Sequence, residues 1–162
     1  MPKIYVGTYN AYNAGSLKGK WLDLNDYDNH DDFMTACREL HADEHDPEFM
    51  FCDFEDIPRE FVGECYIKPE FWDYMNCDID DSVKEAFMYL FDEWNEERCN
   101  STYIGEFDNR TKMAEQFVDE MGLLSEIPEN LQYYFDYEAY GRDMELSGDV
   151  FEHNRHWFWR NY

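Results

Sequence analysis

Carboxylates are the most abundant reactive groups in this sequence. Its 162 residues include 38 Asp and Glu against 13 Lys and Arg, a formal net charge of −25. The negative charge is spread evenly along the chain, with a net charge of −9 over residues 1–61, −8 over 62–103 and −8 over 104–162. With so many carboxylates, some pair always has a separation suited to acid–base catalysis, so pairing alone does not indicate a glycosidase. The charge disfavours direct nucleic acid binding, because phosphate contacts need clusters of Lys and Arg.

Two short motifs could hold a cation. His41 and His45 have the spacing of a zinc-binding pair on one helix face, but a metalloprotease needs Glu directly after the first His, and Pro47 ends any helix there. Residues 23–28 resemble a calcium loop but lack the Gly at its sixth position, and Met34 replaces the Glu at its twelfth. We therefore expect no metal and no cofactor, and an exposed pair of histidines at a helix end.

The thiols and hydroxyls form no catalytic pattern. The five cysteines, at positions 37, 52, 65, 77 and 99, form no CxxC pair and match no zinc spacing, which is typical of reduced thiols in a cytosolic protein. The chain has no Ser-centred nucleophile elbow, Gly-rich phosphate loop or catalytic Cys signature. We expect no catalytic residue and no enzyme.

The composition predicts a folded protein. Aromatic residues make up 19% of the chain, whereas disordered acidic chains are poor in them. Apolar runs of only a few residues predict no membrane span, and no signal-like segment follows Met1. We expect a soluble, cytoplasmic protein. Because so negative a field destabilises a compact sphere, we expect an elongated shape, or cations or a basic partner that offset the charge.

Patterning over residues 1–61 predicts a small antiparallel sheet with one helix. Asn29 can cap that helix, on which Phe33, Cys37 and Leu40 recur at helical spacing. The expected elements are strands over 3–9, 20–24 and 48–54, a loop over 10–19, and a helix over 30–41.

Residues 62–103 predict helices. A short helix spans 69–76. A long helix begins at Asp80 or Asp81 and runs to about Cys99. Its apolar stripe is Val83, Phe87, Leu90, Phe91 and Trp94. Like charges four residues apart on its outer faces cost stability, which suggests that they serve a partner.

The last third, residues 104–162, predicts a mixed subdomain. Met113, Phe117 and Met121 are expected to face inward on one helix, with Gly122 as its C-terminal cap. The expected elements are a strand over 102–107, helices over 111–121 and 128–134, and a terminal strand over 149–159. The sequence thus predicts an α+β fold of three small subdomains, 1–61, 62–103 and 104–162, without flexible hinges.

Four segments together resemble one family, the ArdA antirestriction proteins. Residues 15–21 form a G-x-L-x-G-x-W element, and residues 51–56 resemble the Asp-aromatic-Glu end of a strand in that family. Residues 114–123 fall where the family has an acidic helix, and residues 134–144 are similar to its Y-x-D-Y-E-A-x-x-R-D signature. The match spans nearly the whole chain. The residues in these motifs are Gly15, Leu17, Gly19, Trp21, Asp53, Glu55, Asp136, Tyr137, Glu138, Arg142 and Asp143.

The resemblance implies a duplex-DNA mimic. ArdA-like proteins occupy the DNA-binding groove of the specificity and methyltransferase core of Type I restriction–modification enzymes, and so protect incoming mobile DNA. The family fold is a curved rod of three small domains that forms a homodimer through its C-terminal part. At one charge per about 1.7 Å of duplex, 38 carboxylates correspond to about 65 Å of DNA. The alternative function is that of an acidic decoy or chaperone for another basic DNA-binding protein, such as a nucleoid protein, because such a protein would also need a strongly negative surface.

A mimic works through a summed field, so we expect no single carboxylate to be essential. The motif carboxylates could instead have buried structural roles, and Tyr12, Trp21, Tyr137 and Tyr140 are expected to pack rather than contact a partner. The predicted mimic surface consists of Asp92, Glu93, Glu96, Glu97, Glu115, Asp119 and Glu120, with Glu126 and Glu129 as second choices.

Overall fold

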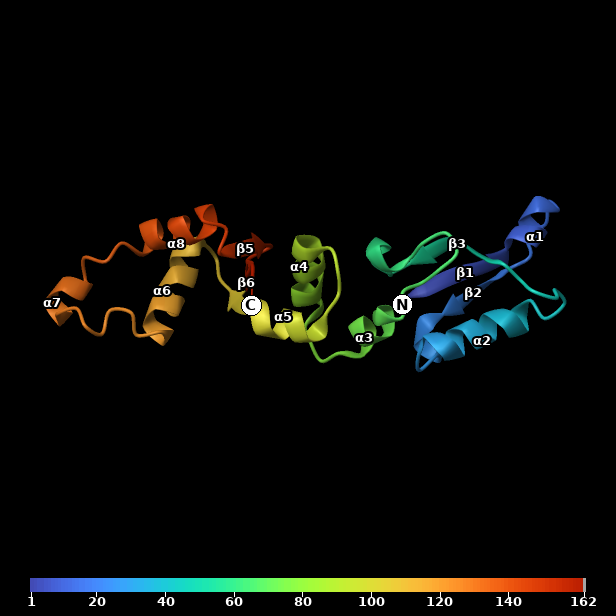
Figure 1. Ribbon diagram of the computed structural model, residues 1–162, viewed down its shortest axis with the longest axis horizontal. Coiled ribbons are helices and arrows are strands. Elements are labelled where there is room, and N and C mark those ends of the chain that lie inside the picture. Colours follow the sequence, from blue (N-terminus) through green and yellow to red (C-terminus); the bar gives the residue numbers. More distant parts are fainter. Residues whose placement is uncertain (162) are drawn as a thin grey trace. The chain divides into compact units, whose positions relative to one another are not determined.

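The computed structural model describes residues 1–161 and has an α+β fold, as predicted. Its described part contains eight α-helices and two three-stranded antiparallel sheets (Figure 1). The chain divides into two compact units, Met1–Cys77 and Asp78–Tyr162, with one sheet in each. The boundaries of the three subdomains stay a prediction.

The N-terminal sheet and its helix form as the sequence predicts. Strand β1 lies between β2 and β3, and helix α2 packs on the sheet through fully buried Phe33 and Cys37. The Asn29 side chain accepts the Asp32 N–H at 3.0 Å and so caps α2. The elements are β1 (Lys3–Thr8), β2 (Lys20–Asp23), α2 (His30–Leu40) and β3 (Phe49–Glu55).

The N-terminal unit contains two further helices. Helix α1 (Tyr9–Asn13) occupies part of the predicted loop, and the Thr8 hydroxyl caps it by accepting the Ala11 N–H at 3.2 Å. Helix α3 (Glu70–Asn76) belongs to this unit, because the Trp72 indole donates to the Tyr27 carbonyl at 3.1 Å. Short 3-10 turns occupy Leu24–Asp26 and Arg59–Phe61.

The long central helix predicted to reach Cys99 is wrong. It ends as α4 (Asp81–Phe91), because Asp92 adopts a left-handed conformation with φ of 58°, and α5 (Glu96–Thr102) then begins afresh. The side chain of Asn95 starts α5 by accepting the Arg98 N–H at 2.8 Å. The expected repulsive pairs Asp92/Glu96 and Glu93/Glu97 therefore do not lie on one continuous helix.

The predicted terminal strand over 149–159 is instead a hairpin. Strands β5 (Val150–His153) and β6 (His156–Trp159) pair around Asn154 and Arg155, which have φ of 50° and 70°. Asn tolerates this left-handed region, so it supplies the turn that a continuous strand would lack. Strand β6 lies between β5 and β4 (Tyr103–Glu106).

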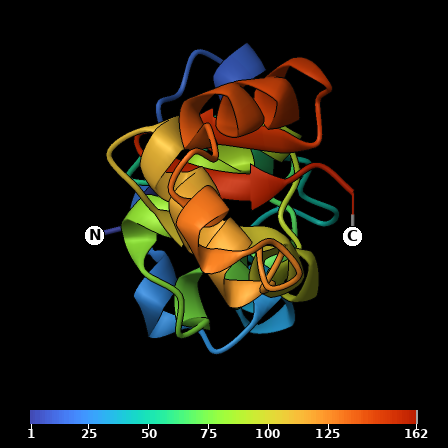
Figure 2. The same cartoon turned by 90° about the vertical axis from the view of Figure 1, so that its left-hand side faces the viewer.

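Helices α6 (Arg110–Glu120) and α8 (Tyr137–Leu146) pack together in the C-terminal unit (Figure 2). Met113 is fully buried, but the inward orientation predicted for Met121 is wrong, because its side chain is 61% exposed. Gly122 follows α6 with φ of 61°, as expected of a C-terminal glycine. Helix α8 was not predicted, and α7 (Glu129–Gln132) is shorter than expected.

Candidate functional site

The acidic residues lie at the surface of both units. All 38 are within the described residues and none is buried; only Asp23, Glu44, Glu115 and Glu145 are half-buried, and the others are exposed. Ionised carboxylates are costly to bury, so this distribution is physically favourable. It also means that nearly all of the charge of −25 faces solvent and any partner.

The first predicted group surrounds the joint between α4 and α5. Glu96 and Glu97 are exposed in the first turn of α5, where the helix dipole favours negative charge. Glu93 differs, because Arg98 donates to its Oε1 at 2.5 Å while lying 4.5 Å from the centre of the Phe91 ring. Glu93 therefore helps to fix the joint, and the placement of Asp92 and Glu93 on a helix face is corrected.

The second group lies on α6. Glu115 and Asp119 are four residues apart and so share a helix face. Lys112 donates to Glu115 at 2.8 Å and partly offsets its charge. Asp119 and Glu120 are exposed in the last turn, and Gln116 donates to Glu120 at 2.5 Å. Asp119 and Glu120 therefore face solvent, and their part in a mimic surface stays a prediction.

The third group follows α6 and combines carboxylates with exposed apolar side chains. Glu126 is exposed in the connecting segment, and Glu129 is exposed in the first turn of α7. Exposed apolar clusters of this kind mark contact surfaces. The exposed apolar residues of this segment are Met121, Leu123, Ile127, Leu131, Tyr133 and Tyr134.

The G-x-L-x-G-x-W element is built around the ring of Tyr5. The Tyr5 hydroxyl donates to the Leu17 carbonyl at 2.8 Å, and the Trp21 ring meets Tyr5 edge-on at 5.7 Å. A Cβ on Gly19 would lie 2.6 Å from the Tyr5 ring, so only glycine fits there. Gly15 has φ of 73°. These motif residues order the loop, although the Leu17 side chain itself is 87% exposed.

Asp53 and Glu55 lie exposed on β3, an edge strand. Glu55 faces Lys3 across the β1–β3 pair and accepts from its ammonium at 2.9 Å. This hydrogen bond raises the pKa of Lys3. The Asp53 carboxylate accepts the neighbouring Phe54 N–H at 2.9 Å. Neither carboxylate is buried, so both stay available to a partner.

The C-terminal signature forms helix α8. The Asp136 carboxylate accepts the Ala139 N–H at 3.0 Å, which makes Asp136 the N-cap. Glu138 is exposed in the first turn, and Arg142 and Asp143 are exposed with Nε and Oδ1 3.9 Å apart. Tyr137 is half-buried, and its ring meets that of Phe135 edge-on with 5.0 Å between ring centres. The capping carboxylate thus has a structural role.

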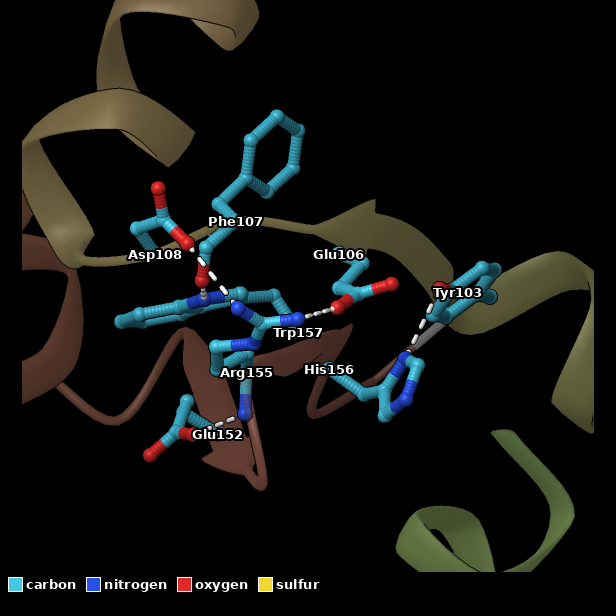
Figure 3. Close-up of polar contacts among 8 residues, drawn as sticks. All are labelled: Tyr103, Glu106, Phe107, Asp108, Glu152, Arg155, His156 and Trp157. Atoms are coloured by element: carbon cyan, nitrogen blue, oxygen red, sulfur yellow. Dashed lines mark hydrogen bonds and ion pairs between the residues drawn. The ribbon is translucent and has the colours of Figure 1, made fainter. Parts of the chain in front are cut away.

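Sequence reasoning missed a cluster at the hairpin turn (Figure 3). The Arg155 guanidinium donates to Glu106 and, at 3.1 Å, to Asp108, and its backbone N–H donates to Glu152 at 2.6 Å. Hydrogen bonds to charged groups are stronger than neutral ones, so this arrangement ties β4 to the hairpin. Asn154 is a local sequence signal for the turn, because Asn tolerates the left-handed conformation that it adopts here, but it does not indicate the carboxylate partners of Arg155.

A comparison with protein families agrees with these motifs. The model of the antirestriction protein family ArdA matches residues 4–158. The chain belongs to the ArdA family of antirestriction proteins. Its function is therefore antirestriction, and its partners belong to the class of restriction enzymes. A search of curated proteins found no match.

The metal motifs have other roles in this ArdA-family chain. Helix α2 ends at Leu40, so His41 and His45 do not share a helix face. The expectation that both histidines are exposed is wrong for His41, which is fully buried with its Nε2 3.2 Å from the Val6 carbonyl. The Asp23 carboxylate caps the turn after β2 by accepting the Asn25 N–H at 3.0 Å. Within residues 1–161, no three metal-ligating side chains gather into a site.

The five cysteines of this ArdA-family chain are free thiols. Burial raises the pKa of the Cys37 thiol from 9.0 to about 12, whereas Cys52 and Cys65 are exposed. A raised pKa keeps a thiol protonated and unreactive. No described helix has the length and apolar character needed to cross a membrane.

Proposed function

We propose that this chain inhibits Type I restriction–modification enzymes as a mimic of duplex DNA, and so protects incoming mobile DNA. The single observation that supports this most strongly is the exposure of its carboxylates, none of which is buried. A duplex is likewise a surface of regularly spaced negative charge, to which a basic groove binds with release of counterions.

The proposed contact surface consists of exposed acids of the C-terminal unit. Asp92, Glu96, Glu97, Asp119 and Glu120 form its centre, with Glu126 and Glu129 beside them. Glu93 and Glu115 contribute less, because Arg98 and Lys112 partly neutralise them. A homodimer through the C-terminal part is the proposed assembly, supported by the exposed apolar side chains that follow α6.

The direct test of this function is cleavage of unmodified plasmid DNA by a purified Type I endonuclease. We expect the chain to stop cleavage at near-stoichiometric ratios and to leave a Type II endonuclease active. A variant with Glu96→Gln, Glu97→Gln, Asp119→Asn and Glu120→Gln should inhibit less, since it loses four exposed charges. Full inhibition by this variant, or none by the wild-type chain, would contradict the proposal.

A further inference from the structure

Tyr89 is an exposed aromatic side chain with a fixed ring. It lies on the outer side of α4 and is 71% exposed. One face of its ring stacks on the imidazole of His153 in β5, with 3.8 Å between ring centres and 18° between planes. A large ring left in water is held in one orientation, which is the preorganisation that a binding anchor needs.

The rigid core under α4 explains how this stack is maintained. Phe87 and Phe91 point into the unit, where Phe87 packs on Phe158 at 5.9 Å and Phe91 packs on Phe151 at 6.1 Å. These contacts fix α4 against the β5–β6 hairpin, so that Tyr89 and His153 stay adjacent.

The charges around Tyr89 favour a cation on its free face. Asp81, Glu85 and Tyr89 are spaced four residues apart and share one side of α4, and both carboxylates are exposed. Lys84 pairs with Asp81 at 2.8 Å, so Glu85, one helical turn from Tyr89, is the main acid that favours a cation there. Arg155, two residues after His153 in the chain, is held by Glu106 and Asp108. The π-face of an aromatic ring is itself negative.

We propose that Tyr89 is a cation–π anchor that receives an arginine side chain from the basic groove of the partner enzyme. Arginine fits better than lysine, because its planar guanidinium stacks on an aromatic face while donating to a carboxylate such as Glu85. This inference rests on the proposed function and goes beyond it, since a pure charge mimic would need no aromatic ring. Duplex DNA presents no such ring on its backbone.

The test compares Tyr89 variants in displacement of a fluorescent duplex from a purified Type I methyltransferase core. We expect Tyr89→Ala and Tyr89→Leu to displace DNA about fivefold more weakly than wild type, and Tyr89→Phe to match it, because Phe keeps the ring face. Tyr12→Ala is the matched control: Tyr12 was expected to pack, but its side chain is 57% exposed, and it lies in the N-terminal unit, outside the proposed surface. Urea unfolding of each variant verifies that the fold is intact.

The failures of the two proposals are distinguishable. If the wild-type chain displaces DNA and Tyr89→Ala does so equally well, the anchor is overturned and the proposed function stands. If the wild-type chain displaces no DNA, the proposed function fails, and titration of the chain with an oligoarginine peptide still tests the ring. We then expect NMR shifts of the Tyr89 ring with oligoarginine that exceed those with oligolysine. Equal shifts would overturn the anchor.

Discussion

Gly141 of α8 lies directly against the backbone of Arg110 at the start of α6. A Cβ at this position would be 2.7 Å from the Arg110 carbonyl oxygen and 3.3 Å from the Ala114 methyl group. The two helices are therefore close enough for their backbones to touch. The Arg110 guanidinium also donates to Glu145 of α8 at 2.9 Å. Gly141 thus sets the distance between α8 and α6, the helix that carries Asp119 and Glu120 of the proposed surface.

Gly141→Ala should destabilise the chain by about 1–3 kcal/mol, because the new methyl group has no space. In a solvent-exposed helix the same change stabilises by about 0.5–1 kcal/mol. The sign of the change in urea unfolding therefore separates the two situations. An unchanged or more stable variant would show that α6 and α8 do not lie this close.

Asp136 should matter through its hydrogen bond more than its charge. Asp136→Ala removes the N-cap of α8 and should cost about 1 kcal/mol. Asp136→Asn keeps a capping oxygen and should retain stability, while inhibition falls only slightly. Thermal unfolding and endonuclease inhibition measure the two effects. If Asp136→Asn abolished inhibition in a folded protein, the distributed surface would be wrong.

Cys37 should resist thiol reagents in the folded protein. Because burial raises its pKa to about 12, the thiolate is scarce at pH 8, whereas exposed Cys65 should react rapidly. Cys52 is exposed too, but desolvation raises its pKa, so it should react more slowly than Cys65. The raised pKa also makes the contribution of Cys37 to stability complete below pH 9 and lost progressively toward pH 12. Reaction with a disulfide reagent that releases a coloured product, with and without urea, gives the number of accessible thiols in the folded and the unfolded chain. Rapid labelling of Cys37 in the native chain would contradict its burial.

Neutralising exposed acids should weaken inhibition gradually. Each single change among Asp92, Glu96, Glu97, Asp119 and Glu120 should raise the inhibitory concentration about twofold, since an exposed charge contributes a few tenths of a kcal/mol. Four changes should raise it about sixteenfold if they add independently. The uncharged change Asn100→Gln, also exposed on α5, should have no effect. Abolition by one conservative change would instead indicate a catalytic or metal site.

Local patterns predicted the elements that local interactions determine. The strands β1 and β2 and the cap of α2 by Asn29 follow from alternation and capping alone. The break after α4 was missed although Asn95 offered a capping signal, because the apolar stripe continues across it to Trp94. Here the apolar stripe favours one continuous helix and the capping residue favours a break, and tertiary packing determines which of the two forms.

Long-range contacts explain the other differences. The burial of His41 depends on the Val6 carbonyl, 35 residues away in the sequence. The Arg155 cluster depends on carboxylates that precede it by 47 and 49 residues. For the candidate site, the exposure of most chosen acids followed from their charge, but the neutralisation of Glu93 depends on the joint that the helix prediction lacked.

Competition with duplex DNA for the DNA site of a Type I methyltransferase core is the decisive experiment on DNA mimicry. The chain is titrated against a fluorescent duplex carrying the recognition sequence, at about 50 and 200 mM salt. We predict stoichiometric displacement of DNA that weakens as salt rises, because both ligands bind through released counterions. Simultaneous binding of the chain and the duplex, or failure of a folded chain to displace DNA from several Type I families, would contradict mimicry of DNA.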